Sequence, residues 1–119
     1  MKTVAEKLQI KPGDAVLVAG GTPERLALLD PLPAGAAIGG DAPAVAILFA
    51  EDRAALESLL AEAAPHLAAA RVRWIAYPKG NRADINRDTI WALVQEHGWT
   101  LNFNVAVSDV WSALRFKAL

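Results

Sequence analysis

Three short apolar runs, each followed by helix-like sequence, constrain the fold of this chain more than any other feature. They are AVLVA at Ala15–Ala19, AVAILF at Ala44–Phe49 and VRWIAY at Val72–Tyr77. Continuous apolar runs are typical of parallel strands that are covered on both faces. Parallel neighbours also need a crossover connection, which is usually a helix. The alternation therefore predicts an α/β fold of three layers, with a mostly parallel sheet between helices.

Helix start signals follow the first two runs. Thr22 is placed to cap a helix that has Pro23 at its first position and extends to about Leu29. After the second run, Glu51 or Asp52 starts a longer helix with apolar residues three and four positions apart. These apolar positions are Leu56, Leu59, Leu60, Ala63 and Leu67. A proline at position 65 is expected to bend or end this helix.

Two further helices are predicted. Residues 1–10 form a short leading helix, which the Pro-Gly pair at positions 12 and 13 interrupts. Asp84 or Asn86 caps another helix after the third run, and Gly98 ends it. The apolar face of that helix is expected to comprise Ile90, Leu93, Val94 and His97.

The C-terminal segment changes from continuous apolar runs to alternating ones. LNFNVAV begins at Leu101 and VWSALRF at Val110, and Ser108-Asp109 between them suggests a tight turn. We therefore expect an antiparallel hairpin joined to the parallel sheet. The Pro-, Gly- and Ala-rich stretch before the second run allows a loop with one stub of strand at Ala36–Ile38. That stub and the hairpin are the expected edges of the sheet.

The composition of the chain excludes several classes of protein. A length of 119 residues suits one domain, expected to span 1–119. The absence of cysteine excludes thiol nucleophiles and disulfides. A net charge of −1 lacks the basic excess expected of a nucleic-acid binder. The start of the chain is not patterned as a signal peptide, and its apolar runs are too short to cross a bilayer. We expect a cytoplasmic protein without nucleic-acid or membrane partners.

The order of parts resembles a known fold family. IKPGDAVLVAGG follows the leading helix, YPKG follows the third strand, and a helix leads into the antiparallel pair. This order is similar to the class I methyltransferase version of the Rossmann fold. WIAYPKGN, DINRDTIW and DVWSALRF resemble stretches of a family of small bacterial proteins known as a domain of unknown function. The resemblance implies a truncated, degenerate methyltransferase-like core and no particular activity.

The chain departs from true methyltransferases where they bind S-adenosylmethionine. In that family the first turn carries an acidic residue and three alternating glycines, whereas here Ala19 precedes two adjacent glycines. The family also needs a second strand ending in a carboxylate that holds the ribose. The 24 residues between Ala19 and Ala44 accommodate one helix and a stub. Asp41 could take the place of the carboxylate, but its Gly-Gly-Asp-Ala-Pro context is typical of a turn. We expect no cofactor.

Two segments are candidate ligand sites. Backbone amides at Gly20, Gly21 and Thr22 could hold a phosphate or carboxylate, although a tight turn with a threonine cap explains the same residues. The loop after Tyr77 lies where parallel sheets bind ligands. There Lys79 and Arg82 could clamp an anion, with Asn81 donating and Asp84 orienting one of them. A solvated loop and helix cap is the alternative.

The sequence carries weaker signals for metal binding and for catalysis. His66 and His97 fall near helix ends without a convincing third metal ligand, so no metal site is expected. No hydroxyl residue lies in a nucleophile elbow, and no acid–base pair stands out, so no catalytic residue is assigned. Whether the chain is an enzyme stays open. The two hypotheses are a non-catalytic binding or assembly module, and a small enzyme or binder of an anionic metabolite that uses the loop after Tyr77.

Four tryptophans are many for this length. Trp74 is expected in the core because it lies in a buried strand, whereas Trp91 and Trp111 suit either the core or a partner surface. Edge strands invite pairing with another chain unless charge or a bulge protects them. The predicted hairpin carries few charges, so a homodimer through this edge is expected.

Overall fold

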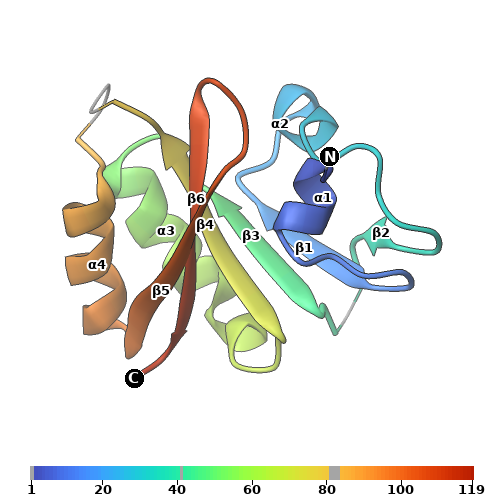
Figure 1. Ribbon diagram of the computed structural model, residues 1–119. Coiled ribbons are helices and arrows are strands. Elements are labelled where there is room, and N and C mark those ends of the chain that lie inside the picture. Colours follow the sequence, from blue (N-terminus) through green and yellow to red (C-terminus); the bar gives the residue numbers. More distant parts are fainter. Residues whose placement is uncertain (1, 41, 81–83) are drawn as a thin grey trace.

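The computed structural model describes residues 2–40, 42–80 and 84–119, and it contains one six-stranded sheet (Figure 1). The strand order is β2-β1-β3-β4-β6-β5. The first four strands in this order pair in parallel, and β6 is antiparallel to both β4 and β5. This confirms the predicted class, a mostly parallel sheet with a C-terminal antiparallel hairpin. The strands are β1 (Ala15–Ala19), β2 (Ala37–Ile38), β3 (Val45–Phe49), β4 (Val72–Pro78), β5 (Trp99–Ala106) and β6 (Trp111–Ala118).

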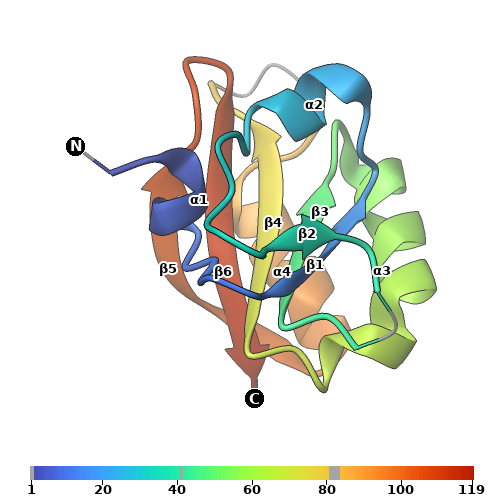
Figure 2. The ribbon, with the colours of Figure 1, turned by 90° about the vertical axis from the view of Figure 1, so that its right-hand side faces the viewer.

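Helices lie on both faces of this sheet (Figures 1 and 2). They are α1 (Val4–Lys7), α2 (Pro23–Ala27), α3 (Arg53–Leu67) and α4 (Arg87–Glu96). The apolar residues of α3 and α4 form one core cluster with one face of the sheet. Those of α1 and of the segment after α2 form a second cluster on the opposite face. The sheet therefore separates two cores, as three layers require.

The strand β3 is covered on both faces, and this explains why its residues form a continuous apolar run. Every residue of β3 is buried, and its side chains alternate between the two cores. Leu48 points into the core with α3 and α4, whereas Ile47 and Phe49 point into the core with α1. Each such side chain contributes about 1.5–3 kcal/mol by burial. Trp74 is also fully buried, as predicted, and its Nε1 donates to the Leu8 carbonyl at 2.8 Å.

The helix caps decide two alternatives that the sequence left open. Asp52, rather than Glu51, caps α3 and accepts from the Ala55 amide at 2.8 Å. Asn86, rather than Asp84, caps α4 and accepts from the Thr89 amide at 2.9 Å. Thr22 caps α2 as predicted. Each cap satisfies an amide that the first helical turn leaves without a partner.

Three predictions about helices need correction or refinement. His97 is exposed rather than part of the buried face, because α4 ends at Glu96 and the histidine is its C-cap. The leading helix is a single turn, since Gln9 has a φ of +64° that ends helical geometry before the predicted Pro-Gly break. Pro65 lies inside α3, which ends two residues later at Leu67.

The sheet edges are those that the sequence predicts. β2 is a stub of two exposed residues beside β1, and β5 is the edge on the opposite side. The Ser108 hydroxyl oxygen closes the hairpin turn by accepting from the amides of Val110 and Trp111 at 3.2 and 3.0 Å. A register shift interrupts the β5–β6 pairing between Leu101 and Phe103. Among the described residues, none of the helices has the length and apolar character needed to span a membrane.

Candidate functional site

The turn after β1 is tightly packed against the end of β3. Gly20 has a φ of +72°, and a Cβ added there would lie 2.4 Å from the carbonyl oxygen of Phe49. At Gly21 a Cβ would lie 3.0 Å from the Val18 side chain. Thr22 then caps α2 by accepting from the Arg25 amide at 3.2 Å. These contacts explain the two glycines and the threonine as a tight turn with a cap.

Arg25 closes over this turn. Its Nη1 donates to the Gly20 carbonyl at 2.7 Å, and its Nη2 lies 3.3 Å from Oε2 of Glu51, which lies in the β3–α3 connection. The guanidinium carbon lies 5.0 Å from the centre of the Trp111 ring, a cation–π contact. We call Gly20, Arg25, Glu51 and Trp111 the Arg25 cluster. It joins the carboxyl ends of β1 and β3 to the hairpin, at the edge where α/β sheets usually bind ligands.

Trp111 anchors the hairpin to this cluster. Its ring packs edge-on against Phe49 with centroids 5.4 Å apart. The same ring lines a shallow hollow of about 360 Å³, together with Glu24, Arg25, Leu28, Ser108 and Val110. The sequence is compatible with Trp111 in either the core or a partner surface, and the structure shows it half-buried, lining the hollow. No sequence pattern points to Arg25, because its partners Gly20, Glu51 and Trp111 come from three separate segments.

The loop after β4 is anchored at both of its described ends. The Lys79 amide donates to the Val110 carbonyl at 2.8 Å, which attaches the loop to the hairpin turn. Oδ1 of Asp84 accepts from the Arg53 amide at 2.9 Å, at the start of α3. Asp84 therefore holds the start of α3. Asn81 and Arg82, the other residues of the predicted anion clamp, lie outside the described residues, as does Asp41 after β2.

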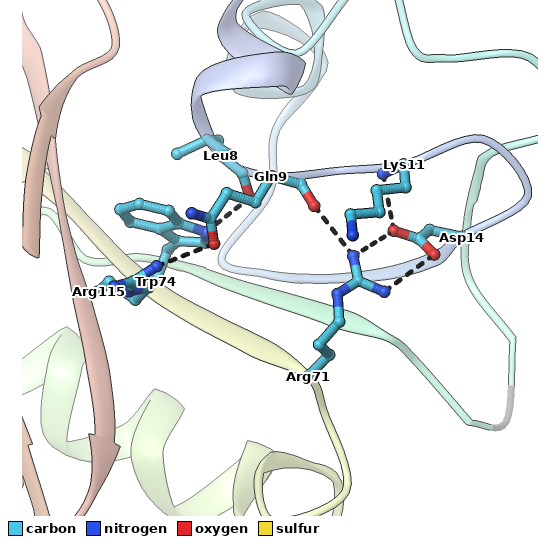
Figure 3. Close-up of polar contacts among 7 residues, drawn as sticks. All are labelled: Leu8, Gln9, Lys11, Asp14, Arg71, Trp74 and Arg115. Carbon is cyan, nitrogen blue, oxygen red and sulfur yellow. Dashed lines mark hydrogen bonds and ion pairs between the residues drawn. The ribbon is translucent and has the colours of Figure 1, made fainter.

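A second polar cluster lies at the amino ends of the parallel strands (Figure 3). Arg71, just before β4, pairs with Asp14, just before β1, with Nη2 and Oδ2 2.7 Å apart. Hydrogen bonding by Arg71 lowers the pKa of the Asp14 carboxyl, and the Lys11 amide adds to this effect, while burial opposes it. The same hydrogen bond raises the pKa of Arg71.

Arg73 extends this basic region along β4. Its guanidinium donates to the carbonyl oxygens of Leu67, Ala70 and Phe116 at 2.6, 2.9 and 3.2 Å. It also lies 4.6 Å from the centre of the Trp99 ring. Burial lowers the pKa of Arg73. Its polar partners in these contacts are neutral, so its positive charge faces carbonyl dipoles rather than a carboxylate.

The structure does not bring the histidines into a shared site. His97 is exposed at the end of α4, and His66 is half-buried near the end of α3. In the part of the chain that the structure describes, no three His, Asp or Glu side chains are grouped so as to hold a metal ion. The buried Ser112 hydroxyl donates to Asn104 and to the Val105 carbonyl within the hairpin. The Ser112 hydroxyl is therefore engaged within the hairpin.

By sequence the chain matches no family model and no curated protein. By structure it resembles a Streptococcus agalactiae protein of the NADB-Rossmann superfamily, with a TM-score of 0.61 at 7% identity over 99% of this chain and 68% of the other. The ribosomal protein L11 methylase of Lactobacillus delbrueckii subsp. bulgaricus gives 0.59 at 12% identity, over 97% and 74%. The tRNA methyltransferase TrmK of B. subtilis gives 0.56 at 12%, over 98% and 64%.

These likenesses define the class of fold. The chain has the Rossmann-like architecture of class I methyltransferases, including the antiparallel strand pair that ends the sheet. The chain spans between 64% and 74% of the length of the three proteins named above. The segment between β1 and β3 contributes α2 and the two-residue strand β2.

Proposed function

We propose that this protein is a non-catalytic, cofactor-free module with a methyltransferase-like fold, which acts by binding or assembly. The Arg25 cluster is the main support. In class I methyltransferases the turn after the first strand lies beneath the methionine moiety of S-adenosylmethionine. Here the carbonyl of that turn accepts from Arg25, and Trp111 lies against the same guanidinium. Protein side chains therefore take the place beside the turn that a cofactor would need.

The short connection between β1 and β3 supports the same proposal. β2 has two residues, and both are exposed. A strand of this length offers little surface against which an adenosine could pack. The described residues around the turn also lack a nearby acid–base pair, since Glu51 is engaged by Arg25.

Titration calorimetry with S-adenosylmethionine and S-adenosylhomocysteine tests the proposal. We expect no saturable heat from the full chain with either compound. A Rossmann-type methyltransferase titrated under the same conditions is the positive control. A one-to-one complex with a micromolar dissociation constant, about −8 kcal/mol, would overturn the cofactor-free proposal.

A second candidate function is a small enzyme or binder of an anionic metabolite that uses Lys79, Asn81, Arg82 and Asp84. The observation that favours it is the anchoring of this loop, by Lys79 to the hairpin and by Asp84 to α3. These two contacts fix Lys79 and Asp84 near the carboxyl edge of the sheet, where α/β sheets usually bind ligands.

Replacing Lys79 and Arg82 together by alanine tests this second candidate. If the loop holds the anion, the double variant loses the thermal shift given by sugar phosphates, while its free energy of unfolding changes by no more than about 0.5 kcal/mol. For comparison, a ligand at 100 times its dissociation constant stabilises the folded chain by about 2.7 kcal/mol. A large loss of stability without ligand would mean that the two side chains brace the fold, and this candidate would be wrong.

A further inference from the structure

A hollow of about 630 Å³ lies at the amino ends of the parallel strands, opposite the Arg25 cluster. It is bounded by α1, the start of β4 and the β5–β6 hairpin. Six of the twelve lysines and arginines of the chain line it, but only one of the thirteen acidic residues does. The basic residues are Lys2, Lys11, Arg71, Arg73, Arg115 and Lys117, and the acidic one is Glu6.

The nearby carboxylates do not balance this charge. Oε1 of Glu6 accepts from the amide and the hydroxyl of Thr3, both at 3.2 Å, so it is engaged in the cap of α1. Asp14 pairs with Arg71 at the rim of the hollow. Arg73 adds no available charge, because three backbone carbonyls bind its guanidinium. With both carboxylates counted against the other five basic residues, three positive charges remain in excess. The chain as a whole has a net charge of −1, so the excess is a local feature.

Arg115 provides a fixed positive group in this hollow. Its Nε donates to Oδ1 of Asn102 at 3.1 Å, and its Nη1 donates to Oε1 of Gln9 at 3.0 Å. Both partners are neutral, and the described residues include no carboxylate within ion-pair distance of Arg115. The guanidinium is half-buried and held in position before any ligand arrives. Guanidinium groups of this kind bind phosphate oxygens strongly and with defined geometry.

Gln9 accepts hydrogen bonds from both Arg71 and Arg115, and its backbone is strained (Figure 3). Its side chain accepts from Arg115, and its carbonyl oxygen accepts from Nη2 of Arg71 at 3.0 Å. Its φ of +64° is unfavourable for a residue with a side chain. Strained residues held by their surroundings concentrate at functional sites. Here the strained residue orients both guanidinium groups at the hollow.

We propose that this hollow binds the oligophosphate group of a small molecule, such as a pyrophosphate or triphosphate group. The excess of three positive charges matches a multiply charged anion, and the volume lies within the range of about 300–1,000 Å³ that small-molecule pockets occupy. The site is separate from the Arg25 cluster and from the loop after β4. The inference therefore does not depend on the proposed function.

Titration calorimetry of the full chain with inorganic tripolyphosphate tests the inference. We expect one-to-one binding that weakens as ionic strength rises, because salt screens the exposed lysines. In a K11Q/K117Q variant the dissociation constant should rise about tenfold, since two exposed cations leave the site. ATP titrated in parallel distinguishes the source of the oligophosphate. Tighter binding of ATP indicates a nucleotide, and equal binding indicates recognition of the phosphates alone.

A K7Q/R53Q variant is the matched control, because it removes the same net charge from exposed positions outside the hollow. It should bind tripolyphosphate like the parent chain. Equal weakening in both variants would mean that net charge alone attracts the anion, and the inference would be wrong. It would be equally wrong if tripolyphosphate gave no saturable heat, or if a single-stranded oligonucleotide bound to these residues and tripolyphosphate did not.

Discussion

The ion pair between Asp14 and Arg71 joins two segments that lie 57 positions apart in the sequence. Asp14 precedes β1 and Arg71 precedes β4, so the pair fixes the amino ends of strands that are not neighbours in the sheet. Asp14 also accepts from the Lys11 amide at 2.7 Å. One carboxylate thus positions the N-terminal loop against the start of β4.

The lowered pKa of Asp14 predicts how stability depends on pH. A carboxyl whose pKa is lower in the folded chain than the unfolded value of about 3.9 stabilises the fold above that pH. This stabilisation is lost as the pH falls through the lower, folded value. An Asp14→Asn variant should therefore be roughly 1 kcal/mol less stable than the parent chain at pH 7. The difference should shrink below about pH 4.

Urea denaturation at several pH values measures this difference. Asp109→Asn is the control, because Asp109 is an exposed carboxylate in the hairpin turn and should change stability by less than about 0.5 kcal/mol. A difference between Asp14→Asn and the parent chain that stayed constant from pH 7 to pH 3 would contradict the prediction. Such a result would mean that the variant loses stability through poorer packing rather than through loss of the Asp14–Arg71 ion pair.

At the scale of elements, the strands and long helices could be predicted because their signals are local. The apolar run of β3 and the spacing of Leu56, Leu59, Leu60, Ala63 and Leu67 in α3 lie within single segments. The residues that cap the helices are harder to predict from the sequence. Asp84 and Asn86 are both good cap residues, and only the contact of Asp84 with the Arg53 amide shows that Asp84 serves a different helix.

The candidate sites could be predicted less well, because they depend on contacts between distant segments. Arg25 meets Gly20, Glu51 and Trp111, and no spacing in the sequence links these residues. The positive φ of Gln9 shortens α1, although glutamine carries no sequence signal for that geometry. Arg115 reaches Gln9 across 106 positions. No local sequence pattern therefore points to the basic hollow, and the net charge of −1 for the whole chain hides the local excess.

For the whole molecule, the two ends of the sheet differ in net charge and in how their arginines are paired. At the carboxyl ends, Arg25 is paired with Glu51 and packed on an aromatic ring. At the amino ends, the hollow retains an excess of positive charge. A Rossmann-like sheet normally binds ligands at its carboxyl ends. In this chain, the features that favour an anionic ligand lie at the opposite edge.

The outer edge of β5 leads to a prediction about self-association. β5 spans eight residues and carries no charged side chain, and its outer backbone has no neighbouring strand in the sheet. Phe103 on β5 is 51% exposed and Trp91 on α4 is 38% exposed, so apolar surface flanks this edge. Both residues are among those that line a hollow of about 270 Å³ at this edge. The register shift near Phe103 is a local irregularity rather than a block along the whole strand.

We propose that two copies pair through β5 in a twofold dimer that buries more than about 1,000 Å². Light scattering at micromolar concentration should then give twice the monomer mass of 12.6 kDa. Phe103→Lys should shift the protein to the monomer mass, because charge on an edge strand opposes pairing between chains. Circular dichroism shows whether this variant stays folded, and Lys7→Gln on α1 is the control that leaves the edge unchanged. A parent chain that keeps the monomer mass after tenfold concentration would mean that the register shift is enough to protect the edge, and the dimer proposal would be wrong.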